Sequence, residues 1–151
     1  LSLFQATLLP LSTLLTPNIP EAELLAGRPI HGLEDMKAAA RQIQRMGPKA
    51  VLGKGGHGQG REKTDLLLID GSFHTFSSAT ISTRNTHGTG CTLSSAIASF
   101  VARGQGICEA VASAKAYLYE ALRAGADVSV GEGHGPVNHF YDPQPLILTE
   151  Q

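Results

Sequence analysis

The stretch NTHGTGCTLSSAIASF, residues 85–100, joins a glycine turn to the start of an apolar repeat. Leu93, Ile97 and Phe100 recur at helical spacing, which predicts a helix over 90–103. A Gly-x-Gly turn at the entry of a helix exposes backbone N–H groups at the positive end of the helix dipole. The stretch therefore predicts an anion site at the first turn of a helix.

Cys91 falls in that first turn, where the helix dipole favours the thiolate form of a cysteine. The alternative interpretation is a flexible turn followed by a small buried residue. The glycines alone fit both interpretations.

Short apolar runs and helical patterns alternate on either side of this stretch. This alternation predicts an α/β layered sheet with flanking helices, in which ligands lie beyond the carboxyl ends of the strands. A helix end over 1–9 is expected to close at Pro10, the pair Asp70-Gly71 predicts a hairpin turn, and the tail from Asp127 is expected to lack regular structure. Buried strands are predicted at 12–16, 50–53 and 66–69, an extended segment at 73–83, and helices at 20–26, 33–46 and 107–123.

Two further polar clusters follow predicted strands. Lys54 stands at a strand end beside flexible glycines and suits a phosphate as a point charge, although a solvated loop lysine is the alternative. The literal G-x-G-x-x-G at 53–58 is not a dinucleotide fingerprint, because the chain leads from it into another strand and not into a helix. Asn18 and Glu21 are three residues apart across a helix start, so Glu21 either caps the helix or holds a metal-bound water.

Composition excludes several classes of protein. The 151 residues carry 12 Lys+Arg and 13 Asp+Glu, so a net charge of −1 gives no basic surface for nucleic acid or an acidic membrane. The longest apolar runs, such as 66–69, are far shorter than the roughly 20 residues of a membrane span. Two cysteines without paired spacing and no signal-peptide pattern indicate a cytoplasmic protein. Since the chain begins at Leu1 and not at Met, we expect that residues precede it.

Three strings together resemble one family. TPNIPEAE at 16–23, KGGH at 54–57 and the stretch at 85–98 resemble the hydroxymethylpyrimidine/phosphomethylpyrimidine kinases of thiamine biosynthesis, members of the ribokinase-like superfamily. The tail GHGPVNHF at 133–140 resembles the C-terminal signature of that family. The resemblance implies phosphorylation of hydroxymethylpyrimidine and its monophosphate, a small-molecule pyrimidine substrate, with ATP and Mg²⁺.

The resemblance also implies roles for particular residues. Cys91 stands where most of the superfamily has an aspartate base, and our hypothesis is that it is the general base toward the hydroxyl and orients the phosphate acceptor. The implied residues are Gly88, Thr89, Gly90 and Cys91 for the anion hole, Lys54, Gly55, Gly56, Thr86 and Lys115 for ATP, and Asn18 and Glu21 near Mg²⁺.

The length of the chain departs from the family. Members resemble it only in their C-terminal half, so residues 1–151 are expected to form a single partial domain that holds the nucleotide and phosphate half. An uncovered sheet edge and core face would favour a homo-oligomer or association with the missing N-terminal half. Two alternatives stay open, a pyridoxal-type vitamin B6 kinase and a non-catalytic fragment that binds nucleotide or nothing.

Overall fold

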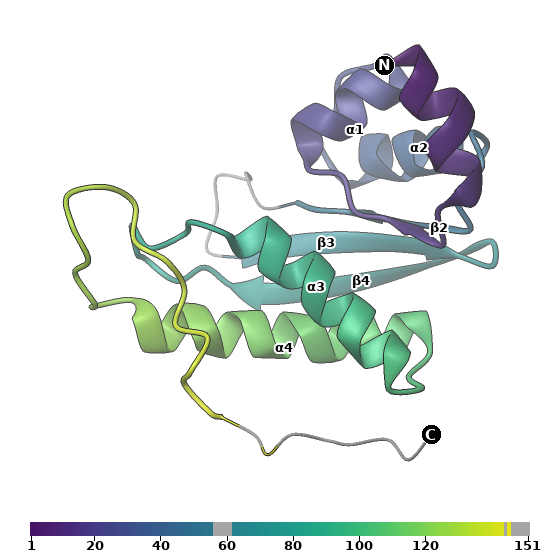
Figure 1. The fold of residues 1–151 in the computed structure, drawn as a ribbon. Coiled ribbons are helices and arrows are strands. Elements are labelled where there is room, and N and C mark those ends of the chain that lie inside the picture. The colour runs from purple at the N-terminus through teal and green to yellow at the C-terminus, as the bar shows by residue number, and fades with distance from the viewer. Residues whose placement is uncertain (56–61, 144, 146–151) are drawn as a thin grey trace. The chain divides into compact units, whose positions relative to one another are not determined.

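The structure is a computed structural model that describes residues 1–55, 62–143 and 145. The chain divides into two compact units, Leu1–Thr80 and Ile81–Gln151, each described separately below (Figure 1). The single-domain organisation expected from the sequence stays a prediction.

The first unit contains a four-stranded sheet in the order β1-β2-β3-β4. β1 pairs with β2 in parallel, with Leu14 opposite Ala50, whereas the other neighbours are antiparallel. The mixed sheet confirms the predicted α/β class. Its strands are β1 (Leu14–Leu15), β2 (Ala50–Gly53), β3 (Glu62–Ile69) and β4 (Ser72–Ala79).

The hairpin between β3 and β4 turns at the predicted Asp-Gly pair. Asp70 has φ 49° and Gly71 has φ 75°, and two positive φ values match the twist of a two-residue hairpin turn. β3 begins at Glu62, four residues before the predicted strand, because polar residues also pair across the hairpin. The hydroxyls of Thr64 and Ser77, for example, are hydrogen-bonded at 2.9 Å.

Two helices and the N-terminal segment build the core of this unit. α1 (Ile19–Ala26) and α2 (Leu33–Gln44) confirm the predicted helices, although α2 ends two residues earlier than expected. Leu33, the first residue of α2, is 43% exposed because it lies in the opening turn of the helix. The buried cluster comprises Leu9, Ala22, Leu25, Ala26, Ile30, Met36, Ala39, Ala40, Ile43, Val51, Leu66 and Leu68.

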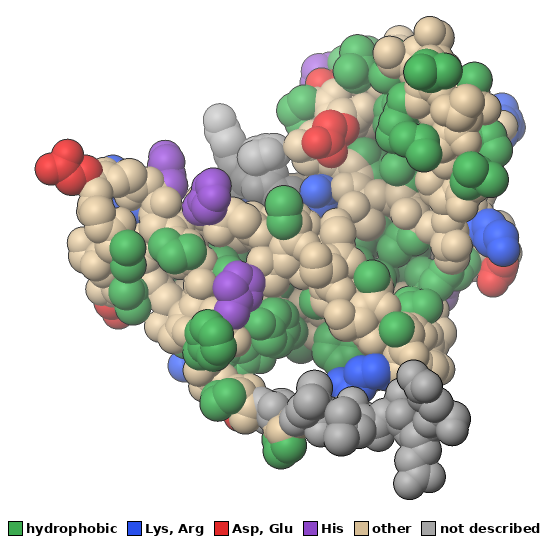
Figure 2. All heavy atoms as spheres, in the orientation of Figure 1, with side chains coloured by type: hydrophobic (Ala, Val, Ile, Leu, Met, Phe, Trp, Pro, Cys, Tyr) green, Lys and Arg blue, Asp and Glu red, His purple; other side chains and the backbone are tan. Residues whose placement is uncertain are grey.

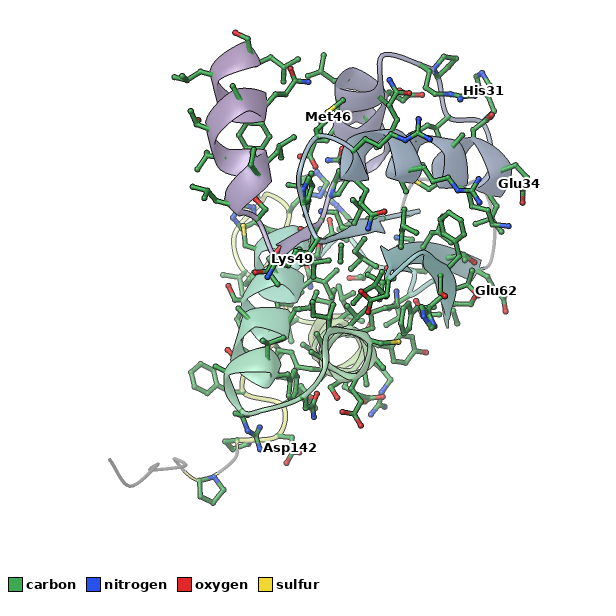
Figure 3. The ribbon with its side chains drawn as sticks, turned by 90° about the vertical axis from the view of Figure 1, so that its right-hand side faces the viewer. His31, Glu34, Met46, Lys49, Glu62 and Asp142 are labelled. Atoms are coloured by element: carbon green, nitrogen blue, oxygen red, sulfur yellow. The ribbon has the colours of Figure 1, made fainter. Side chains whose placement is uncertain are left out.

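The N-terminal helical segment, residues 2–11, departs from the sequence expectation. It runs through Pro10, which was expected to close it, because the proline sits at the start of a separate short turn, Leu9–Leu11, where its missing N–H costs nothing. The strand after it is half-buried and two residues long, not the buried strand expected over 12–16. Figure 3 shows Met46 beside this segment, where its sulfur accepts a 3.9 Å hydrogen bond from Gln5 Nε2.

The second unit is built on two helices that pack side by side, α3 (Thr89–Ala102) and α4 (Ile107–Gly125), as Figure 1 shows. Leu93 and Ile97 of α3, which recur at helical spacing, are buried, whereas Val101 is exposed. Beyond Gly125 the described residues form no helix or strand, which agrees with the expectation for the tail. No helix within the described ranges has the length and apolar character to cross a membrane.

Candidate functional site

The first turn of α3 presents backbone donors. Gly88 precedes the helix with φ 82°, a conformation that favours glycine, and its carbonyl accepts the first helical bond from Thr92 N–H at 2.8 Å. Thr89 N–H donates to Thr86 O at 3.3 Å, which holds Thr86 against the turn. Within the part of the chain that the structure describes, the N–H groups of Gly90 and Cys91 have no acceptor. Both residues are exposed, so the helix start is open to an anion.

The side chain of Asn85 anchors the turn before α3 to the end of α4 and the tail. Its buried amide Nδ2 donates to Gly125 O at 2.7 Å and to Val128 O at 2.6 Å. His87 N–H donates to Gly135 O at 3.1 Å, which ties the same loop to the tail. Asn85 is the first residue of the stretch 85–100, but no role for it was predicted, since an asparagine in a turn is too common to indicate a tertiary anchor.

Two cavities flank the helix start in the second unit. One, of about 690 Å³, is lined by 82–85 and 126–133, the two segments that Asn85 joins. The other, of about 480 Å³, follows α3 from Cys91 to Arg103 and includes Tyr117. Both volumes fall within the usual range of small-molecule sites. Lys115, half-buried in the middle of α4, lines neither cavity.

Tyr117, which lines the smaller cavity, has an aromatic neighbour. Tyr117 packs against Tyr141 with ring centroids 5.5 Å apart, and its hydroxyl contacts His139 Nδ1 at 3.3 Å. Burial, together with the neighbouring Tyr117, Asp142 and Glu120, raises the pKa of Tyr141. Neither tyrosine was singled out from the sequence.

In the first unit, Asn18 and Glu21 form a capping box at the start of α1. Asn18 Oδ1 accepts a hydrogen bond from Glu21 N–H at 2.8 Å, and Glu21 Oε2 accepts one from Asn18 N–H at 2.8 Å. The capping role that the sequence left open for Glu21 is therefore present. The end of β2 lies beside this cap, because Lys54 N–H donates to Pro17 O at 2.9 Å and Lys54 forms a parallel bridge with Asn18.

The side-chain oxygens of Asn18 and Glu21 could hold a magnesium ion only if water and phosphate supplied most of its ligands. Mg²⁺ binds commonly through one or two carboxylates and keeps several waters. Glu21 Oε2 accepts the hydrogen bond of the cap, which leaves Oε1 as a ligand for such an ion. In the described ranges, no group of three or more His, Cys, Asp or Glu residues is arranged to hold a metal ion.

The turn after Lys54 is fixed by a residue that sequence reasoning missed. Asp65, which is 6% exposed, accepts a hydrogen bond from Gly55 N–H through Oδ1 at 2.9 Å. A Cβ on Gly55 would overlap the carbonyl oxygen of Thr64, so only glycine fits this approach. Asp65 stands directly before the predicted strand over 66–69, and a polar residue at that place gives no signal of its partner. Gly56 and the rest of the glycine loop through Arg61 lie outside the described residues.

Apart from Lys115 in the middle of α4 and Gly56 outside the described residues, the predicted site residues fall into two clusters, one in each unit. The structure brings Lys54 and Gly55 beside Asn18 and Glu21 in the first unit, and Thr86 beside the start of α3 in the second. The members of the second cluster are Thr86, Gly88, Thr89, Gly90 and Cys91.

A mixed α/β sheet and a helix start with open N–H groups are both typical of proteins that bind anionic groups. The chain belongs to the phosphomethylpyrimidine kinase family, whose model matches residues 1–138. It is 49% identical over 135 residues to the hydroxymethylpyrimidine/phosphomethylpyrimidine kinase of Rhizobium meliloti, with 89% of this chain and 51% of that protein covered. These matches confirm the family indicated by the sequence motifs.

Two further comparisons extend the match. The thiamine biosynthesis bifunctional protein ThiED of Geobacter sulfurreducens is 48% identical over 139 residues, which cover 92% of this chain and 28% of that protein. The pyridoxal kinase from Staphylococcus aureus in complex with AMP-PCP and pyridoxal superposes with a TM-score of 0.87 at 33% identity, covering 93% of this chain and 52% of that one. The likeness confirms the expected ribokinase-like fold. The chain spans about half the length of the curated kinase it matches, and less of the bifunctional protein.

Gly135 tests the anchor around Asn85. A Cβ at Gly135 would overlap Asn85 Oδ1, whereas at Gly133 it would meet nothing within 4 Å. We expect Gly135→Ala to destabilise the protein by about 1–3 kcal/mol, the usual cost of overpacking, and Gly133→Ala to be nearly neutral. Urea unfolding of both variants measures this, and equal stabilities would contradict the packing described for Asn85.

Asp65 tests the turn after Lys54. Replacement by alanine leaves the Gly55 N–H without its acceptor, so we expect Asp65→Ala to lose about 1–3 kcal/mol of stability. The isosteric Asp65→Asn keeps an oxygen acceptor and should lose less. Hydrogen exchange of the Gly55 amide gives a local readout: it should accelerate most in the alanine variant, and unchanged exchange there would show that Asp65 does not hold the turn.

Proposed function

We propose that this protein provides the phosphate-binding machinery for ATP-dependent phosphorylation of hydroxymethylpyrimidine and its monophosphate. The observation that carries the proposal is the pair of unbonded N–H groups at Gly90 and Cys91, on a chain that belongs to a kinase family. The Rhizobium meliloti relative is named for both substrates. The free thiols of Cys91 and Cys108 suit a reducing, cytoplasmic compartment.

The start of α3 suits the transferred phosphoryl group. Phosphoryl transfer passes through a loose transition state in which charge spreads over the equatorial oxygens, so catalysis depends on positioning and charge stabilisation. The backbone donors of Gly90 and Cys91 are fixed before the reaction by the helix and by the Gly88 turn. In this proposal, residues 88–91 form the anion hole.

Cys91 is proposed as the general base toward the hydroxyl acceptor. Its side chain is exposed at the first turn of α3, beside the proposed anion hole. Because the acceptor hydroxyl loses its proton late in a loose transition state, a thiolate is a sufficient base. A phosphate acceptor is already anionic, and toward it Cys91 would act by orientation alone.

The remaining predicted residues are assigned to ATP and its metal. Lys54 is proposed to offer a point charge to the phosphates from the end of β2, with Gly55 and Gly56 next to it in the chain. Thr86 and Lys115, in the second unit, are proposed as further contacts to ATP. The cavity of about 690 Å³ is proposed for the nucleoside part, and the AMP-PCP complex of the Staphylococcus aureus pyridoxal kinase supports nucleotide use in this fold. Asn18 and Glu21 would hold Mg²⁺, which neutralises phosphate charge when bound.

The structural match to a pyridoxal kinase favours a second candidate substrate. Turnover of hydroxymethylpyrimidine and of pyridoxal, measured with the same preparation and ATP, separates the two kinases. Faster turnover of pyridoxal would overturn the proposed substrate. ATP binding is measured by calorimetry on the chain alone and after addition of the part of the Rhizobium meliloti kinase that the match does not cover. If ATP binds in neither experiment, the non-catalytic alternative is supported.

Cys91→Ala tests the base. We expect phosphorylation of hydroxymethylpyrimidine to fall by about 10²- to 10⁴-fold, the usual contribution of a general base, and phosphorylation of the monophosphate to fall less. Cys108→Ala, which removes the other free thiol, should leave both rates unchanged. Coupled assays of ADP release measure both reactions. Equal rates for Cys91→Ala and the unaltered protein on the alcohol would exclude Cys91 as the base.

A further inference from the structure

The tail string GHGPVNHF at 133–140, here called the tail strap, resembles the C-terminal signature of the family, and the proposed phosphate chemistry uses none of its side chains. Gly135 and Val137 of the strap are buried and the residue between them is exposed, as in an extended chain that packs on one side. Asn138 N–H donates to Ala121 O at 3.0 Å. The tail strap is therefore held on α4.

Two hydrogen bonds join the tail strap to the loop that leads into α3. His87 N–H donates to Gly135 O at 3.1 Å, and His134 Nδ1 lies 3.1 Å from Arg84 O. Because a carbonyl oxygen can only accept, Nδ1 of His134 carries the hydrogen, and in the neutral imidazole Nε2 is left as an acceptor. Figure 2 shows histidine side chains gathered on the surface of this loop and the tail. The contact with Arg84 thus selects one tautomer of His134.

The carbonyl of Arg84 is connected to the start of α3 through the backbone. The same oxygen accepts Thr86 N–H at 3.0 Å, which closes a three-residue turn around Asn85. A carbonyl oxygen has two lone pairs, so it accepts from Thr86 and His134 together. Thr86 O in turn accepts the N–H of Thr89, the first residue of α3, at 3.3 Å. A series of hydrogen bonds therefore runs from His134 to the helix start.

The peptide between Arg84 and Asn85 is held at both ends. Its N–H donates to Thr83 Oγ1 at 3.0 Å, and its C=O accepts from His134. Thr83 Oγ1 itself donates to Ala126 O at 3.0 Å, so the N–H end is tied to the residue after α4. The C=O end is tied to the tail strap. With both ends fixed, this peptide cannot rotate, and the direction in which the chain enters the α3 turn is set.

We propose that His134 is a positioning residue for phosphoryl transfer, which acts through the carbonyl of Arg84 on the start of α3. Its imidazole touches neither ATP nor the acceptor. It holds the turn in the orientation that aims the open N–H groups of Gly90 and Cys91 before the reaction. Preorganised donors stabilise charge in the transition state without reorganisation, so a loosened turn slows the transfer. The inference rests on the anion hole of the proposed function and extends it to the tail strap.

Three substitutions of His134 test the position of its donor. The amide nitrogen of asparagine is two bonds from Cβ, as is Nδ1 of histidine, whereas that of glutamine is three bonds away, as is Nε2. We expect hydrogen exchange at the Thr86 and Thr89 amides to accelerate roughly three- to tenfold in His134→Ala and His134→Gln, the loss of about one hydrogen bond. In His134→Asn, exchange should stay near the unaltered rate. Unchanged exchange in His134→Ala would overturn the inference.

The tautomer of His134 gives a spectroscopic readout. In ¹⁵N NMR of the neutral imidazole, the hydrogen should reside on Nδ1, because the bond made by one ring nitrogen sets the protonation of the other. A neutral ring with its hydrogen on Nε2 would contradict the bond to Arg84. His139→Ala is the matched control, since His139 is an exposed histidine of the same strap whose Nδ1 faces Tyr117 Oη. It should leave exchange at Thr86 unchanged.

Steady-state kinetics separate this inference from the proposed function. With ATP and hydroxymethylpyrimidine, we expect kcat of His134→Ala to fall by about 10- to 100-fold, as for a misplaced reacting group, while KM for ATP changes less than about threefold. His134→Asn should restore most of kcat. Turnover by the unaltered protein with an equal kcat in His134→Ala, or a change in KM alone, would overturn the inference and leave the proposed function standing. No turnover by the unaltered protein would overturn both.

Discussion

The first N–H groups of an α-helix have no acceptor within the helix, and the second unit is arranged around that constraint at α3. Gly88 adopts a positive φ that turns the chain sharply into the helix, so the N–H groups of Gly90 and Cys91 stay open. Such a turn needs support from outside itself. Asn85 provides it by donating to the carbonyls of Gly125 and Val128, which link the turn to the end of α4.

The first unit positions its cluster by a different rule, the direction of its strands. β1 and β2 are parallel, so the residues that follow them emerge at the same edge of the sheet. This is why Lys54, which is far from Asn18 in sequence, forms a bridge to it. At this edge, the capping box of Asn18 and Glu21 rigidifies the residues that follow β1. Asp65 holds the turn at Gly55 that follows β2. A lysine, a carboxylate and backbone donors are thereby presented on fixed elements.

Family membership and partial length have to be considered together. The motifs that resemble the family are present in order, and the family model matches residues 1–138. The same chain covers about half of the related kinase, and the apolar segment at residues 2–11 is exposed. Large exposed apolar surfaces in globular proteins commonly mark interaction sites.

The sequence by itself determined the helices, the Asp-Gly hairpin and the family. These features depend on local spacing, on glycine at positive φ and on strings of contiguous residues, all of which can be recognised without knowledge of tertiary contacts. It also indicated the α3 start as an anion site, because the donors there belong to the backbone. The roles proposed for the site residues stay predictions.

Only the tertiary structure decided the supporting contacts. Asn85 and Asp65 act on backbone groups 40 and 10 residues away, and the residue type gives no signal of such a partner. The extension of β3 to Glu62 and the course of residues 2–11 through Pro10 were also missed, because cross-strand pairing and packing against the core override local patterns. The open edge of β1 follows from strand order, which is a property of the assembled sheet and not of any one segment.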